Sequence, residues 1–140
     1  MIKHMQYAFS QYGIKEKKGI KNNPEVIKYF KELGYTSKQL KDETAWCSAF
    51  VNWVLKMSDA PYTGKLDARS WLEIGMETKS PQLGDVVVFW RESKKSWKGH
   101  VGFYINQVGD EIFVLGGNQD DQVNISSYPV SRLLGYRVII

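Results

Sequence analysis

The chain is poor in the residues that build disulfides and metal sites. Its 140 residues include one cysteine, Cys47, and two histidines, His4 and His100. A single cysteine excludes an intramolecular disulfide and a multi-cysteine zinc site, and two histidines argue against a multi-histidine metal centre. We therefore expect no cofactor and no metal ion.

Long apolar runs are also lacking. No stretch approaches the roughly 20 apolar residues that a membrane-spanning helix needs. The N-terminal residues 1–5 lack the apolar core of a secretory signal. The sequence therefore predicts a protein made in the cytoplasm without a signal peptide and without a membrane span. Work at the cell wall or in the periplasm would require release or delivery by another system.

Positive charge is concentrated in the first third of the chain. Residues 1–41 hold nine lysines against three glutamates, and the formal net charge is +4. This imbalance is typical of contact with a polyanion such as a cell-wall polymer, and equally of a solvated, lysine-rich helix face. Because zinc-finger spacing, heptads and ribonucleoprotein aromatic motifs are missing, we do not expect nucleic-acid binding.

The apolar pattern changes from helical to strand-like along one domain, residues 1–140. A helix is predicted from Asn23-Pro24 to a stop at Gly34, because Asn caps and Pro suits the first turn. Further helices are expected over about 45–57 and 67–74. Five strands are predicted, at about 86–90, 100–106, 111–115, 122–126 and 134–139. Helices followed by an antiparallel meander indicate an α+β fold.

The only thiol lies at the expected start of the 45–57 helix. A helix N-terminus carries about half a positive charge and unpaired N–H groups. Both favour the thiolate, the form that attacks carbonyl groups. Cys47 shares a helical stripe with Phe50 and Val54, so it should face the element on which this helix packs. The alternative is an inert, buried cysteine.

His100 and Asn118 are candidates for the other two catalytic residues of a cysteine hydrolase. Such an enzyme needs an imidazole near the thiolate and a group that orients the imidazole. His100 begins a predicted strand, and Asn118 and Gln119 follow the neighbouring one. A side-chain amide oxygen there could accept the proton on the far imidazole nitrogen. His4 competes poorly, because it lies in a polar N-terminal tail that we expect to fray.

Seven stretches, in this order and spacing, carry a resemblance to known enzymes. They are residues 23–24, 42–52, 68–72, 81–89, 99–104, 115–119 and 134–137. The chain resembles the NlpC-type and CHAP cysteine hydrolases of the cell wall, closest to a short subgroup of phage lysins and bacterial wall hydrolases. CHAP stands for cysteine, histidine-dependent amidohydrolase/peptidase. The resemblance implies a papain-like core, with Cys47 as nucleophile and His100 as base. Ala45 departs from the subgroup, which often has Pro there.

The third catalytic residue varies within the broad family, and here Asn118, Gln119 or Asp120 could fill its place. We favour Asn118. Substrate binding is predicted for Glu43, Trp46 and Gln119. Helix capping would explain Glu43 equally well, and large aromatic residues of a small domain usually belong to the core.

The resemblance implies a peptidoglycan hydrolase that cuts an amide bond in the stem peptide or at its junction with the glycan. We expect a monomer that acts as a phage lysin, a remodelling enzyme or an injected antibacterial toxin, the last with a cognate immunity protein. Two alternatives stay open. One is a non-catalytic wall-binding module that retains the fold, and the other is a papain-like hydrolase of another amide or acyl conjugate.

Overall fold

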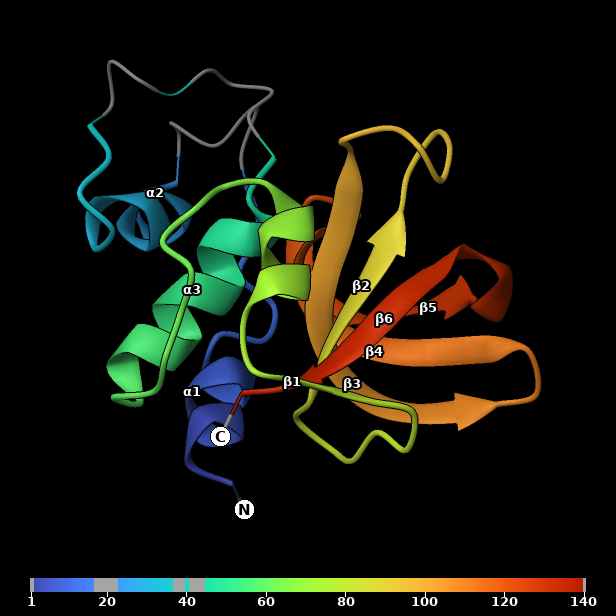
Figure 1. Ribbon diagram of the computed structural model, residues 1–140. Coiled ribbons are helices and arrows are strands. Elements are labelled where there is room, and N and C mark those ends of the chain that lie inside the picture. The colour runs from blue at the N-terminus through green and yellow to red at the C-terminus, as the bar shows by residue number, and fades with distance from the viewer. Residues whose placement is uncertain (1, 17–22, 37–39, 41–44, 140) are drawn as a thin grey trace.

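The computed structural model describes residues 2–16, 23–36, 40 and 45–139, and its helices precede its strands (Figure 1). The α-helices are α1 (Lys3–Ser10), α2 (Pro24–Lys31) and α3 (Cys47–Met57), and the short 3₁₀ helices are η3 (Ala68–Glu73) and η4 (Val130–Arg132). The strands are β1 (Met76–Thr78), β2 (Val86–Trp90), β3 (Gly99–Val108), β4 (Glu111–Gln119), β5 (Gln122–Pro129) and β6 (Leu133–Val138). The predicted α+β fold is confirmed.

Helices α2 and α3 begin differently. At α2 the Asn23 side chain accepts a hydrogen bond from the Glu25 backbone N–H, with Pro24 in the first position, as the sequence predicted. Helix α3 begins at Cys47, because Trp46 is its N-cap and makes no side-chain capping bond. The capping oxygens expected from residues 42 and 44 lie outside the described residues. No side-chain cap from Trp46 therefore occupies the helix end that carries the thiol.

The N-terminal segment corrects the expectation of a frayed tail. It forms helix α1, which buries His4, Met5 and Ala8. The His4 imidazole nitrogen Nε2 lies 2.8 Å from the Gly84 carbonyl oxygen, and its ring packs 5.4 Å from that of Phe103. Buried apolar contact and this hydrogen bond therefore hold α1 to the body of the domain.

The strands form one antiparallel sheet in the order β1-β6-β2-β3-β4-β5. The sequence predicted about five strands and missed β1, which has three residues and pairs only with β6. Strands β5 and β6 are consecutive in the chain but four places apart in the sheet. The link between them is the three residues of η4, which are too few to span four strand spacings of a flat sheet. The sheet therefore curls, and Tyr128 of β5 stacks on Phe89 of β2.

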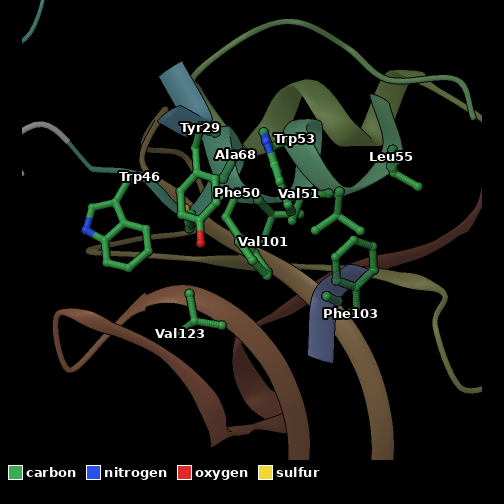
Figure 2. Close-up of a cluster of buried hydrophobic side chains, with 14 of the residues drawn as sticks. Tyr29, Trp46, Phe50, Val51, Trp53, Leu55, Ala68, Val101, Phe103 and Val123 are labelled. Carbon is green, nitrogen blue, oxygen red and sulfur yellow. The ribbon is translucent and has the colours of Figure 1, made fainter. Parts of the chain in front are cut away.

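The main core lies between the helices and one face of the sheet, with α1, α2 and α3 on the same side (Figure 1). Phe50 of α3 packs edge-on to Phe103, with the ring centroids 6.3 Å apart. Figure 2 shows both side chains with Val101 between α3 and the sheet. A smaller cluster covers the opposite face: Val87, Phe89, Ile112, Val114 and Tyr136. Within the described ranges, no helix is long and apolar enough to span a bilayer.

Candidate active site

The thiol sits where the start of α3 meets the start of β3. Cys47 is the first residue of α3 and is 3% exposed. The backbone N–H group of Val101, the residue after His100, lies near enough to the sulfur to lower the pKa of the thiol. The prediction that Cys47 faces inward is confirmed. The structure therefore brings the cysteine beside the strand segment that carries the imidazole.

The His100 ring is held by aromatic packing on the opposite face of β3 from Val101. It pairs across the sheet with Phe89. Tyr128 of β5 stacks on both rings, with centroid distances of 4.7 Å to His100 and 4.9 Å to Phe89. Burial, followed by the nearby Cys47, raises the pKa of Tyr128. Tyr128 therefore lies close to both the thiol and the imidazole, although sequence reasoning did not single it out.

Gln119 orients the imidazole. Its Oε1 lies 2.9 Å from His100 Nε2, while its Nε2 donates to the carbonyl oxygens of Val114 and Asn124 at 3.1 and 2.8 Å. Because the amide nitrogen must donate to those carbonyls, Oε1 is the acceptor and His100 Nε2 carries the proton. The other ring nitrogen, Nδ1, is then the unprotonated base.

The structure puts Gln119 in the position that was expected for Asn118. Regular alternation along β4 would place Asn118 on the same face as Gly116, toward His100. The register with β5 shifts between Gly116 and Gln119, which marks a β-bulge. A one-residue insertion exchanges the faces of the residues that follow, so Gln119 turns toward His100. The strand also runs to Gln119, whereas the sequence predicted a break at Gly116.

Backbone conformation explains the roles of the neighbours. Asn118 has φ +59°, and asparagine is among the residues that tolerate this left-handed region. Asp120 and Asp121, with φ +55° and +60°, form the two-residue turn between β4 and β5, as a type I′ hairpin requires. Asp120 is exposed, so Asn118 and Asp120 serve the turn geometry while Gln119 contacts the imidazole.

Burial sets the protonation of the pair. It raises the pKa of the Cys47 thiol, against the opposing effects of the Val101 N–H, the α3 N–H groups and the Arg91 charge. Burial also lowers the pKa of His100 to about 4, against the Gln119 hydrogen bond. The expectation that the helix start makes Cys47 a thiolate is therefore wrong for the resting site. The effect of burial on the pKa of Cys47 outweighs the effect of the helix N-terminus. Cys47 and His100 are therefore both neutral near pH 7.

Two cavities flank this pair. One, of about 690 Å³, is bordered by Cys47 and the β2–β3 loop, and the other, of about 370 Å³, by His100, Asn118 and Gln119. Arg91 and Arg132 border both cavities. Among the described residues, no group of three or more His, Cys, Asp or Glu side chains could hold a metal ion.

Two of the three predicted substrate-binding residues do not face a cavity with a free side chain. Trp46 is fully buried, and its indole N–H donates to Glu16 at 2.9 Å. Gln119 borders the His100 cavity, but its amide is occupied by His100 and two carbonyl oxygens. Packing and internal hydrogen bonds use both side chains, and a role in substrate binding stays a prediction for each. Glu43 lies outside the described residues.

Sequence reasoning also missed a clamp on the loop that borders the Cys47 cavity. Arg69 of η3 donates from three guanidinium nitrogens to the carbonyl oxygens of Ser93, Lys94 and Lys98, at 2.9, 2.7 and 3.0 Å. The loop carries Arg91 and Trp97, which is 72% exposed and borders the cavity. The motif at 68–72 was part of the resemblance, but no local signal tied Arg69 to residues 24 to 29 positions away.

The CHAP domain family matches residues 39–118 of this chain, which include Cys47, His100 and Asn118. The chain belongs to the CHAP family. The match ends one residue before Gln119, so it does not include the residue that contacts the imidazole. None of the curated proteins compared with this CHAP chain matches it.

Among solved structures, this CHAP chain is similar to RipD from Mycobacterium tuberculosis, described as a non-catalytic NlpC/p60 domain protein adapted to peptidoglycan binding. The identity is 14%, the TM-score is 0.54, and the match covers 96% of this chain and 92% of RipD. A lipoprotein-like NLP/P60 family protein from Staphylococcus aureus is matched at 15% identity and a TM-score of 0.48, over 89% of this chain and 45% of that one. At 14% identity, the likeness to RipD supports the fold alone.

Proposed function

We propose that this protein is a cysteine amidohydrolase that cuts an amide bond of peptidoglycan, in the stem peptide or at its junction with the glycan. The observation that carries the proposal is the oriented imidazole. Gln119 holds the Nε2–H of His100, which leaves Nδ1 as the base, and the Cys47 thiol lies near Val101, the next residue of β3. The CHAP assignment supports amide hydrolysis, and the description of RipD supports peptidoglycan as the partner.

The reaction starts from the neutral pair. His100 Nδ1 takes the Cys47 proton as the sulfur attacks the amide carbonyl carbon. The C–N bond then breaks, and the imidazolium returns its proton to the leaving amine. A water molecule, deprotonated by Nδ1, attacks the thioester, which releases the carboxylic acid and restores the thiol. The backbone N–H of Cys47, at the start of α3, would donate to the developing oxyanion.

Charge separation during attack is opposed by burial, which disfavours both the thiolate and the imidazolium. The groups that lower the pKa of Cys47 therefore assist the step. They are the Val101 N–H, the first N–H groups of α3 and the Arg91 charge. Gln119 assists from the other side, because its oxygen stabilises the imidazolium through Nε2–H.

A non-catalytic peptidoglycan-binding module is the second candidate. RipD is described in those terms, and burial keeps the thiol of this chain protonated at rest. A binding module would need Cys47 only as a small core residue. It would not need an imidazole whose proton is fixed on the far nitrogen by a buried amide. For this reason we place hydrolysis first.

The experiment is clearing of purified cell walls by the wild type, Cys47→Ala and Cys47→Ser, with mass spectrometry of the released fragments. We expect new amino and carboxyl ends with the wild type, and binding without cleavage with both variants. Equal cleavage by Cys47→Ala would remove the thiol from the mechanism. Wall binding by the wild type without any new ends would establish the binding module instead.

A phage lysin, a remodelling enzyme and an injected toxin would share this chemistry. Each would reach the wall by release or delivery, and a toxin would have an immunity protein that covers the cavities around Cys47 and His100. Co-purification with the product of an adjacent gene would favour the toxin.

A further inference from the structure

Two arginines stand at the junction of the two cavities. Arg91 directly follows β2 and Arg132 ends η4, and each borders both the Cys47 cavity and the His100 cavity. They come from segments about 40 residues apart, which meet because the sheet curls and brings the end of β5 toward the end of β2. Two guanidinium groups therefore flank the place where the reacting amide would lie.

Neither guanidinium is neutralised within the part of the chain that the structure describes. The four ion pairs there join Lys3 to Asp59, Lys28 to Glu25, Lys56 to Glu32, and Lys98 to Glu92. Arg132 lies over the Trp90 ring at 5.1 Å, a contact that holds the side chain but leaves its charge uncompensated. The Arg91 charge is close enough to act on Cys47, His100 and Tyr128.

The acidic residues of the cavities lie to either side of this junction. Asp67 and Glu92 border only the Cys47 cavity, and Glu92 is paired with Lys98 at 2.8 Å. Asp120 and Asp121 border only the His100 cavity. The residues common to both cavities are therefore both cationic, whereas each acidic residue borders one cavity only. Arginine is suited to such a site, because its planar fork matches the two oxygens of a carboxylate.

We propose that Arg91 and Arg132 form a carboxylate-binding subsite, so that the enzyme prefers peptides with a free carboxylate next to the scissile amide. This inference rests on the proposed function for its substrate, but the subsite itself can be measured without hydrolysis. An anionic group beside the reacting atom would be drawn to Cys47 whether or not a peptidoglycan amide is the natural target.

The test compares alkylation of Cys47 by iodoacetate and iodoacetamide at low ionic strength. In both reactions the sulfur forms a bond to the CH₂ carbon, iodide leaves with the C–I electron pair, and the thiol proton passes to the buffer. Both reagents need the same thiolate, so the ratio of the two rates cancels any change in the pKa of Cys47. The reagents differ only in the charge next to the reacting carbon.

We expect the iodoacetate/iodoacetamide rate ratio of the wild type to exceed that of a free thiol such as glutathione. Arg91→Gln and Arg132→Gln should each lower the ratio about three- to tenfold, and 0.5 M salt should reduce the difference. The matched control is Lys95→Gln, which removes the same charge from an exposed loop position that borders neither cavity. Both arginines are exposed, so the melting temperature should stay close to that of the wild type.

A second arm uses paired stem-type peptides that carry either a free carboxylate or a carboxamide beside the scissile amide. The wild type should prefer the carboxylate peptide in kcat/KM by about tenfold, and the double arginine variant should show little preference.

An alkylation ratio that is the same in the wild type and the arginine variants would overturn the subsite. An equal fall with Lys95→Gln would also overturn it, as would failure of both reagents to reach Cys47 in the folded protein. If the ratio behaves as expected but neither peptide is cut, the subsite stands and the proposed function fails.

Discussion

The two histidines of this chain lie in similar surroundings, His100 near the start of β3 and His4 against Phe103 in the middle of that strand. Each is buried, each has a lowered pKa because of burial, and each has Nε2 hydrogen bonded to an oxygen. They differ in their neighbours. His100 precedes Val101, whose backbone N–H lies near enough to the Cys47 sulfur to lower the thiol pKa, whereas His4 Nδ1 is buried without a hydrogen-bond partner among the described residues.

This difference separates a candidate base from a structural residue. His4 Nε2 must donate to the Gly84 carbonyl oxygen, so the imidazole holds helix α1 to the turn before β2. A pocket of about 190 Å³ beside it contains no cysteine or other strong nucleophile. Burial and a shifted pKa are therefore poor guides to catalysis in this molecule. The chemistry depends on the partner available to the second ring nitrogen.

The largest effect should come from exchanging the two histidines for glutamine one at a time. His100→Gln removes the base, and we expect kcat to fall by at least about a thousandfold. His4→Gln keeps a donor for Gly84, so kcat should change little while stability falls. Wall-digestion rates and urea unfolding of both variants provide the measurement. Comparable losses of activity would show that the distinction drawn from Nδ1 is wrong.

The next effect concerns the group that orients His100. Gln119→Ala removes the acceptor for Nε2–H, and we expect kcat to fall about a hundredfold because the imidazole loses its fixed tautomer and position. Asn118→Gly retains a residue that adopts positive φ and serves as the matched control, with a change of less than threefold. A larger loss with Asn118→Gly than with Gln119→Ala would restore Asn118 as the third catalytic residue.

Gly116→Ala tests the contact between Gln119 and His100 by adding a methyl group beside it. A Cβ at this position would lie 2.6 Å from Gln119 Oε1 and 3.5 Å from His100 Nε2. We expect Gly116→Ala to displace the Gln119 amide and to lower kcat, but by less than Gln119→Ala does. Full activity would mean that Gln119 can move without consequence for the imidazole.

Acid should weaken the fold through both histidines. The folded pKa of His100, about 4, lies below its unfolded value of 6.5, so the unfolded chain binds more protons between these values. Stability from this group is complete above pH 6.5 and is lost as the pH falls toward 4, by up to about 3 kcal/mol. His4 acts in the same direction.

Urea unfolding at several pH values between 7.5 and 4 would measure this effect. The difference in unfolding free energy between the wild type and His100→Gln should shrink as the pH falls, and likewise for His4→Gln. A difference that stays constant over this range would contradict the lowered pKa values.

The smallest effect should come from the Arg69 clamp. Arg69→Lys can replace only one of the three guanidinium contacts to the β2–β3 loop. We expect a several-fold loss of kcat/KM, because the loop that carries Arg91 is held less firmly, and a larger loss with Arg69→Gln. Hydrogen exchange of residues 91–98 should increase in the same order. Unchanged exchange would show that other contacts hold the loop.

Local patterns in the sequence predicted much of the fold. The Asn23-Pro24 start of α2, the continuous apolar run of β2 and the alternation of β3 are local features, and all three elements lie close to the predicted places. Helix α1 was missed because its sequence is typical of a polar tail, although contacts with Gly84 and Phe103 bury it. Strand β1 was missed because its three residues pair with the distant β6. The inward orientation of Cys47 followed from its helical stripe.

What only the tertiary structure decided is how these parts meet. A bulge in β4 turned Gln119 toward the imidazole, and the residue pattern of β4 alone does not predict such an insertion. Burial reversed the expected charge state of the thiol, since the water removed from around Cys47 depends on the packing of α3 on the sheet. Arg91 and Arg132 share a cavity wall only because the sheet curls and brings the end of β5 toward the end of β2. Residue type and local spacing supplied the candidate groups, whereas distances, protonation and partners arose from contacts between segments far apart in the chain.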